Sequence, residues 1–218
     1  MGHVTKVKIC GITNRDDAEL AVEHGAWAIG LIFAPSPRQI EVAEAEVIGG
    51  QQHRKVEVAG VFANAPLDEV AAIADVAQLT LIQLHGDEGP AYAREVARRT
   101  GARVIKAIPA KDPAAVRRLG AFHTDYHLLD AHVPGMRGGT GQTFQWDWTR
   151  HHPRDVPLIL SGGLTPDNVA EAIGTVHPFA VDTASGIEAA PGVKDPAKVQ
   201  AFFRAVEHAD ATASGEAA

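Results

Sequence analysis

The sequence has one cysteine, few aromatic residues and no long apolar run. A single Cys among 218 residues cannot form an internal disulfide, so we expect a cytoplasmic protein. No segment approaches the roughly 18 consecutive apolar residues of a membrane-spanning helix. Residues 1–8 lack the basic stretch and apolar run of a secretory signal.

Basic residues are also in the minority. There are 20 Lys and Arg against 27 Asp and Glu, giving a net charge of −7, which argues against nucleic-acid and membrane-surface partners. This balance still permits a small anionic ligand held by a few local groups. The composition, 45% hydrophobic and 22% charged, is that of a globular protein and excludes a disordered, collagen-like or coiled-coil chain.

Strand-like and helix-like segments alternate along the chain. Eight short apolar segments predict strands that begin near residues 4, 27, 56, 80, 103, 127, 157 and 179. Between and after them, helical periodicity predicts helices over residues 14–24, 42–52, 67–78, 90–99, 112–119, 165–173 and 196–208. Asp112 with Pro113, and Thr165 with Pro166, have the order of an N-cap followed by a first-turn proline.

This alternation predicts a parallel sheet with right-handed crossovers. Eight units in one chain favour a closed (β/α)8 TIM barrel formed by a single domain, residues 1–208. The alternative is a doubly wound open sheet, which usually has fewer strands. Residues 209–218 are small and polar, and we expect them to be a disordered tail.

Active sites of such barrels lie at the carboxyl ends of the strands, where two candidates for acid–base chemistry occur. Cys10 ends the first strand, so its thiol could act as a general base. Asp130 ends the sixth, and partial burial would suit its carboxyl group to act as a general acid. The simpler interpretations are that Cys10 is a small buried apolar residue and that Asp130 caps a loop.

Two glycine-containing turns follow the seventh and the eighth predicted strands. Gly162 and Gly163 lie after the seventh strand, and Ser185 and Gly186 lie after the eighth, where a short extra helix could begin. Backbone N–H groups of such turns predict a phosphate site, although either turn alone could be merely a tight turn.

Three further polar residues, Arg38, His85 and Asp182, lie at or just beyond strand ends. Arg38 follows two prolines and could bind a carboxylate through two hydrogen bonds, although surface arginines are usually solvated. Residues 138–143 are rich in glycine but lack the Gly-Lys-Ser/Thr ending of a nucleotide-binding loop, so we interpret them as a loop that closes over substrate. No Cys or His spacing predicts a metal site.

Several motifs occur in a characteristic order: residues 8–13, 33–38, 83–86, 129–130, 138–146, 160–164, 181–188 and 192–195. Over residues 4–208 they resemble the phosphoribosylanthranilate isomerase family. The resemblance implies a cofactor-free barrel enzyme of tryptophan biosynthesis. Its reaction is the Amadori rearrangement of N-(5-phosphoribosyl)anthranilate to 1-(2-carboxyphenylamino)-1-deoxyribulose 5-phosphate.

The resemblance also implies residue roles. Asp130 would protonate the furanose oxygen, Cys10 would remove the C2′ proton, and Arg38 would hold the anthranilate carboxylate. His85 and Asp182 would contact substrate, while the two glycine-containing turns would bind its phosphate. The sequence departs from the family pattern at Gln142, often Lys, and at Ala184, commonly Ser.

Two alternatives stay open. One is a related sugar-phosphate isomerase that also serves histidine biosynthesis, although such barrels usually carry Asp where this chain has Cys10. The other is an inactive barrel that only binds a phosphorylated ligand or a partner protein. No long exposed apolar stripe is evident, so we expect a monomer rather than a dimer.

Overall fold

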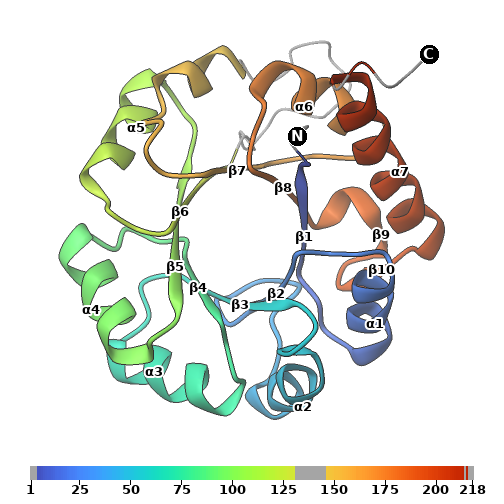
Figure 1. The fold of residues 1–218 in the computed structure, drawn as a ribbon. Coiled ribbons are helices and arrows are strands. Elements are labelled where there is room, and N and C mark those ends of the chain that lie inside the picture. The colour runs from blue at the N-terminus through green and yellow to red at the C-terminus, as the bar shows by residue number, and fades with distance from the viewer. Residues whose placement is uncertain (1–3, 131–145, 214, 216–218) are drawn as a thin grey trace.

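The structure is a computed structural model that describes residues 4–130, 146–213 and 215. Eight parallel strands form a closed barrel in chain order, with β1 pairing both β2 and β8 (Figure 1). The strands are β1 (Lys6–Cys10), β2 (Ala28–Ile32), β3 (Glu57–Phe62), β4 (Leu81–Leu84), β5 (Arg103–Pro109), β6 (Tyr126–Asp130), β7 (Leu158–Ser161) and β8 (Ala180–Thr183). The predicted (β/α)8 barrel is confirmed, and the open sheet is excluded.

Helices surround the barrel (Figure 1). They are α1 (Arg15–Glu23), α2 (Val42–Gln52), α3 (Leu67–Val76), α4 (Pro90–Thr100), α5 (Pro113–Arg118), α6 (Val169–Val176) and α7 (Pro196–Ala213). Shorter elements are the 3-10 segments η1 (Leu119–Ala121), η2 (Trp146–His151) and η3 (Ser185–Ile187), and the strand pair β9 (Glu188–Ala190) and β10 (Val193–Lys194). No helix in the described ranges is both long and apolar enough to cross a membrane.

The start of α5 follows the predicted chemistry. The Asp112 side chain accepts a hydrogen bond of 2.7 Å from the backbone N–H of Ala115, and Pro113 occupies the first helical turn. A side-chain acceptor satisfies an N–H group that the helix itself leaves unpaired, and proline has no N–H to satisfy. This local chemistry was sufficient to predict where the helix begins.

The start of α6 was predicted wrongly. The helix begins at Val169, four residues after Thr165, because the side chain of Asn168 organises an intervening turn. Asn168 Oδ1 accepts from the N–H of Thr165 at 2.8 Å, and its Nδ2 donates to the carbonyl of Gly163 at 3.0 Å. Thr165 Oγ1 accepts from the N–H of Asp167 at 3.3 Å, so Thr165 caps this turn, which comes before the helix.

The end of α7 also differs from the prediction. The helix continues to Ala213 rather than ending at residue 208. Asp210 fixes this extension to the other end of the chain, because its carboxylate accepts from the N–H and the hydroxyl of Thr5 at 2.8 and 2.7 Å. Residues 209–213 are therefore helical, contrary to the expected disorder.

The strands separate two sets of side chains. Residues such as Val7 and Ile9 pack outward against the helices, in the larger apolar cluster. A second cluster, which includes Ala28, Leu81 and Ile159, fills the barrel interior. Because successive strand residues point to opposite faces, Lys8 and Cys10 of β1 face inward.

We predict opposite effects of alanine at two neighbouring glycines of α2. A Cβ at Gly49 would lie 1.9 Å from the Ala77 carbonyl oxygen, whereas a Cβ at Gly50 would meet only the end of Gln78, at 3.6 Å. Gly49→Ala should lower the free energy of unfolding by about 1–3 kcal/mol. Gly50→Ala should raise it by up to about 1 kcal/mol, because alanine has less backbone freedom to lose. Urea unfolding of both variants tests this, and equal effects would contradict the packing described.

Candidate functional site

A cavity of about 250 Å³ opens at the carboxyl ends of the strands. It is lined by Arg38, Asp130, Ser161, Gly162, Gly163, Leu164, Asp182, Thr183, Ala184, Ser185 and Gly186. Seven of these residues were predicted from the sequence. The other two predicted residues, Cys10 and His85, do not line the cavity but interact with residues that do.

Glycines shape one wall of the cavity. Gly162 and Gly163 have φ angles of 98° and 67°, which L-residues other than glycine rarely adopt. A Cβ at Gly186 would lie 1.9 Å from the carbonyl oxygen of Leu164. The loops after β7 and β8 therefore pack against each other only because position 186 has no side chain.

The short helix expected after the eighth strand is present as η3, which begins at Ser185. Just before it, the Thr183 hydroxyl donates to the Leu164 carbonyl at 2.7 Å and ties the same two loops together. A glycine-rich wall beside a helix start is a typical environment for a phosphate group.

Cys10 is buried at the end of β1, with 6% of its surface exposed. Burial raises the pKa of its thiol, because a thiolate is poorly solvated there, whereas the positive charge of Lys8 acts to lower that pKa. The Asp182 carboxylate adds to the rise and the Lys194 ammonium opposes it. The thiol therefore lies between two cations and one anion in a desolvated environment.

A buried ion pair joins this thiol to the cavity. Lys8 Nζ donates to Asp182 Oδ1 at 2.8 Å, and the Ser161 hydroxyl donates to Asp182 Oδ2 at 2.9 Å. Burial alone would lower the pKa of Lys8, but the Asp182 carboxylate and the Cys10 side chain together outweigh this effect, so the pKa is raised. Lys8 is therefore an ammonium ion inside the barrel.

Asp130 ends β6, which is three strands from β1 around the barrel, and lies next to His85. The His85 Nε2 atom is 3.5 Å from Asp130 Oδ2, and the Gln83 amide nitrogen is 3.0 Å from His85 Nδ1. With an amide N–H directed at Nδ1, a neutral His85 ring carries its proton on Nε2 and presents it to the carboxyl group. Gln83 and His85 thereby orient Asp130.

Arg38 forms a bidentate pair with Glu188. Its Nε and Nη2 atoms each donate to a Glu188 oxygen at 2.7 Å. Burial raises the pKa of Glu188, but the hydrogen bonds from Arg38 and the charge of Lys194 outweigh this, so the pKa lies below its usual value. Five N–H donors are available on a guanidinium group, so the pair leaves the Nη1 edge to bind another anion.

Lys194 holds the end of β1 against the loop after β8. Its Nζ donates to the carbonyls of Cys10 and Ala184 at 2.7 and 3.3 Å and to Glu188 Oε1 at 3.1 Å. No role was predicted from the sequence for Lys8, Gln83, Ser161, Glu188 or Lys194. Alternation along β1 would have placed Lys8 beside Cys10, but the Glu188 and Lys194 contacts depend on how loops distant in sequence close.

Gln142 and the predicted glycine-rich loop, residues 138–143, lie outside the described residues. Ala184 lines the cavity next to Ser185. Among the residues that the structure describes, no group of three or more His, Cys, Asp or Glu side chains could hold a metal ion.

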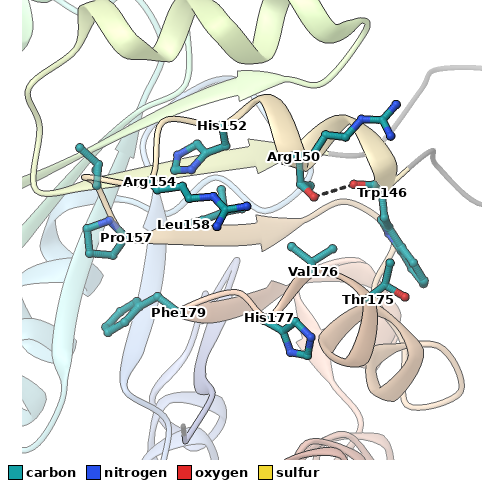
Figure 2. A pocket seen from close by; sticks show the side chains of 12 residues that line it. Trp146, Arg150, His152, Arg154, Pro157, Leu158, Thr175, Val176, His177 and Phe179 are labelled. Carbon is teal, nitrogen blue, oxygen red and sulfur yellow. Dashed lines mark hydrogen bonds between the residues drawn. The ribbon is translucent and has the colours of Figure 1, made fainter. Parts of the chain in front are cut away.

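A larger cavity, of about 500 Å³, lies near the amino ends of β7 and β8, between η2 and the end of α6 (Figure 2). Figure 2 shows Arg154 among its lining side chains, while Arg150 points away from them. None of the predicted site residues lines this cavity. Because barrel enzymes carry out their chemistry at the carboxyl ends of the strands, the smaller cavity is the candidate site.

Fold and site together define the class of protein. Arg38, Asp130 and Asp182 converge from the loop after β2, from β6 and from β8, at the end where enzymes of this fold react. They line a cavity suited to a phosphorylated ligand. The protein is a (β/α)8-barrel enzyme.

Comparison with known proteins identifies the family. Residues 7–205 match the model of the N-(5′-phosphoribosyl)anthranilate isomerase family. The enzyme of that name from Geotalea uraniireducens is 49% identical over 202 residues, covering 92% of this chain and 98% of its own. The chain belongs to the N-(5′-phosphoribosyl)anthranilate isomerase family.

Solved structures of isomerases from this family have a similar fold. The phosphoribosyl anthranilate isomerase of Thermotoga maritima has a TM-score of 0.83 and 39% identity, covering 94% of this chain and 99% of its own. A second isomerase structure contains reduced 1-(o-carboxyphenylamino)-1-deoxyribulose 5-phosphate and has a TM-score of 0.80 and 37% identity, with the same coverage. The fold and the family thus support each other.

Proposed function

We propose that Asp130 and Cys10 are the general acid and the general base with which this chain isomerises N-(5′-phosphoribosyl)anthranilate in tryptophan biosynthesis. Asp130 protonates the furanose ring oxygen, and the ring opens to a Schiff base. Cys10, as a thiolate, then removes the C2′ proton, and the resulting enolamine tautomerises to the ketone. The observation that carries the proposal is the placement of both groups at the carboxyl ends of β1 and β6 in a chain of this family.

The cavity supports the orientation of the substrate. Its glycine-lined wall, formed by Gly162, Gly163, Ser185 and Gly186, suits the phosphate group. Arg38 lines the cavity while Glu188 holds one edge of its guanidinium group, so the remaining edge can bind the anthranilate carboxylate. We expect Asp182, which lines the cavity, and His85, which lies beside Asp130, to contact the sugar.

The substrate assignment can be tested by turnover. The wild-type chain should consume N-(5′-phosphoribosyl)anthranilate, which we would follow by the fluorescence of the anthranilate group. The matching aldose–ketose substrate of the histidine pathway should react at least about 100-fold less efficiently, because Cys10 occupies the position where bifunctional barrels carry Asp. Equal rates on both substrates would favour the bifunctional alternative. Tight binding without turnover of either would favour the inactive barrel.

We further propose a cytoplasmic monomer. The large apolar side chains that are exposed, Val4, Val42, Val76 and Val193, lie on different elements and form no continuous patch within the described residues. The isomerase of Thermotoga maritima is named as dimeric, so a dimer is the alternative that the test has to exclude. Sedimentation equilibrium of the full chain should give a mass near 23.0 kDa, and twice that mass would overturn the proposal.

A further inference from the structure

Lys8 is among the largest fully buried side chains in the described residues, and the reaction proposed above assigns it no part. Its side chain has 0% exposure, and its ammonium group contacts Asp182 at 2.8 Å. Burying a charged pair costs solvation energy, and apolar residues of similar size often fill such a position at least as well. An ionised Lys8 inside the barrel therefore requires an explanation other than stability.

The surroundings of Gly30 show that the Lys8 ammonium group lies near the Cys10 sulfur. A Cβ at this position would be 2.7 Å from Cys10 Sγ and 3.2 Å from Lys8 Nζ. Both atoms approach the same point, so they are no more than about 6 Å apart, within the range over which one charge stabilises another. Because glycine has no side chain, position 30 leaves space for both the sulfur and the ammonium group.

Two other cationic side chains near the sulfur, Lys194 and Arg38, have hydrogen-bond partners of their own. Lys194, from β10, donates to the Cys10 carbonyl and to Glu188. Arg38, from the loop after β2, is paired with Glu188. Asp182, from β8, opposes ionisation of the thiol. Asp130 lies at the end of β6 and contacts His85. Lys8 is also paired, with Asp182, but it is the cation whose ammonium group approaches the space beside Gly30 together with Sγ.

We propose that Lys8 is a positioning residue whose buried ammonium group is the counter-ion of the Cys10 thiolate, and that Asp182 holds it in place. This inference rests on the proposed function of Cys10 as the base. Lys8 keeps its proton throughout: the thiolate takes up the C2′ proton and Lys8 stabilises the thiolate before that transfer. Without Lys8, the same base would be available only at higher pH.

The test measures ionisation of the thiol directly. Because the chain contains one Cys, the thiolate absorbance in the ultraviolet, taken as the difference from Cys10→Ser, reports Cys10 alone. Lys8→Met should move the midpoint of this titration upward by about 1–3 pH units. Asp182→Asn should move it downward, because it removes the opposing carboxylate. General damage to the barrel would not produce shifts of opposite sign.

Turnover supplies a second readout. At neutral pH, Lys8→Met should lower kcat about tenfold for each unit of the shift, since that fraction of thiolate is lost. The rate should recover as pH is raised, with KM changed much less than kcat. A loss of kcat that is the same at every pH would mean that Lys8 is only structural and would overturn the inference.

Lys8→Met leaves Asp182 buried without a cation, and this variant could fail to fold. The double variant Lys8→Met/Asp182→Asn removes both charges, and its titration midpoint should lie above that of Asp182→Asn. A matched control is Lys106→Met, because Lys106 is also buried and pairs with Glu88 at 2.8 Å, but among residues of β4, β5 and their loops. The control should leave the thiol midpoint unchanged.

Two results separate this inference from the proposed function. If Lys8→Met and the double variant leave the titration unshifted while Cys10→Ser abolishes turnover, Lys8 is not the counter-ion although Cys10 is the base. If Cys10→Ser remains fully active, the proposed function itself fails, whatever the titration shows.

Discussion

Replacing Asp130 by Asn should lower kcat by about 10²- to 10⁴-fold, the usual contribution of a general acid or base. Asparagine keeps the shape of the side chain and the hydrogen bond from the Ala110 N–H to the backbone carbonyl of residue 130. It has no acidic proton to give to the ring oxygen, so ring opening would depend on water. Cys10→Ser should lower kcat to a similar extent, because a serine hydroxyl ionises far less readily than a thiol. Steady-state turnover of both variants measures the loss.

Both variants should still bind product. The phosphate and carboxylate ends of the ligand are assigned to the glycine-lined wall and to Arg38, which neither substitution alters. Calorimetric binding of reduced 1-(o-carboxyphenylamino)-1-deoxyribulose 5-phosphate should therefore change by only a few fold. Asp167→Asn, at an exposed position in the turn before α6, is the matched control and should be fully active. A variant at Asp130 or Cys10 with wild-type turnover would contradict the assigned roles.

Two buried histidines should make the protein sensitive to acid. His127 Nε2 lies 3.0 Å from the carbonyl of Phe122, and its Nδ1 lies 3.0 Å from His152 Nε2. The carbonyl can only accept, so the neutral His127 ring donates from Nε2 and accepts from His152. Burial lowers the pKa of His127, and burial followed by the nearby His127 lowers the pKa of His152 to about 4. The pair is neutral in the folded protein.

Stability should therefore fall as pH decreases from about 6.5, the pKa of an unfolded histidine, to about 4. Because the unfolded chain binds protons that folded His152 does not, this residue should contribute about 3 kcal/mol above that range and lose it within the range. Glu88 and Glu188 have lowered pKa values, so their contributions are lost only at more acid pH, from about 4.5 downward. Urea unfolding at a series of pH values measures the dependence.

His152→Gln retains an N–H donor but removes the titrating group. Its stability should depend less on pH between 6.5 and 4 than that of the wild-type chain. His208→Gln changes an exposed histidine on α7 and should leave the dependence unaltered. Parallel pH dependence in the wild-type chain and in His152→Gln would show that the buried pair is not the source.

The fold was largely predictable because its signals are local and repeated. Residues 42–52 were predicted as helix and are α2. Where the prediction was wrong, distant partners were responsible: Thr5 stabilises the end of α7 through Asp210. At the start of α6, the order Thr165–Pro166 predicted a helix that begins there. The sequence did not reveal that the Asn168 side chain would accept from the Thr165 N–H and form a turn first.

The site was predictable where position along a strand decides function. Asp130 and Asp182 were found because strand ends meet at one face of the barrel. Partners of these residues were harder to predict. The pairing of Arg38 with Glu188 and the three contacts of Lys194 depend on the geometry of loops that approach each other only in the closed barrel.

The contacts that join the first 38 residues to residues 182–194 have a consequence for synthesis on the ribosome. Lys8–Asp182, Cys10–Lys194, Thr13–Gly192 and Arg38–Glu188 each join residues at least 150 positions apart in the chain. A nascent chain that lacks its last 40 or so residues has neither the carboxylates nor the lysine that complete these contacts, and closing such long loops is slow. These contacts can therefore form only after the C-terminal segment has emerged from the ribosome, and a chain that ends before residue 182 has no Asp182 to accept from Lys8.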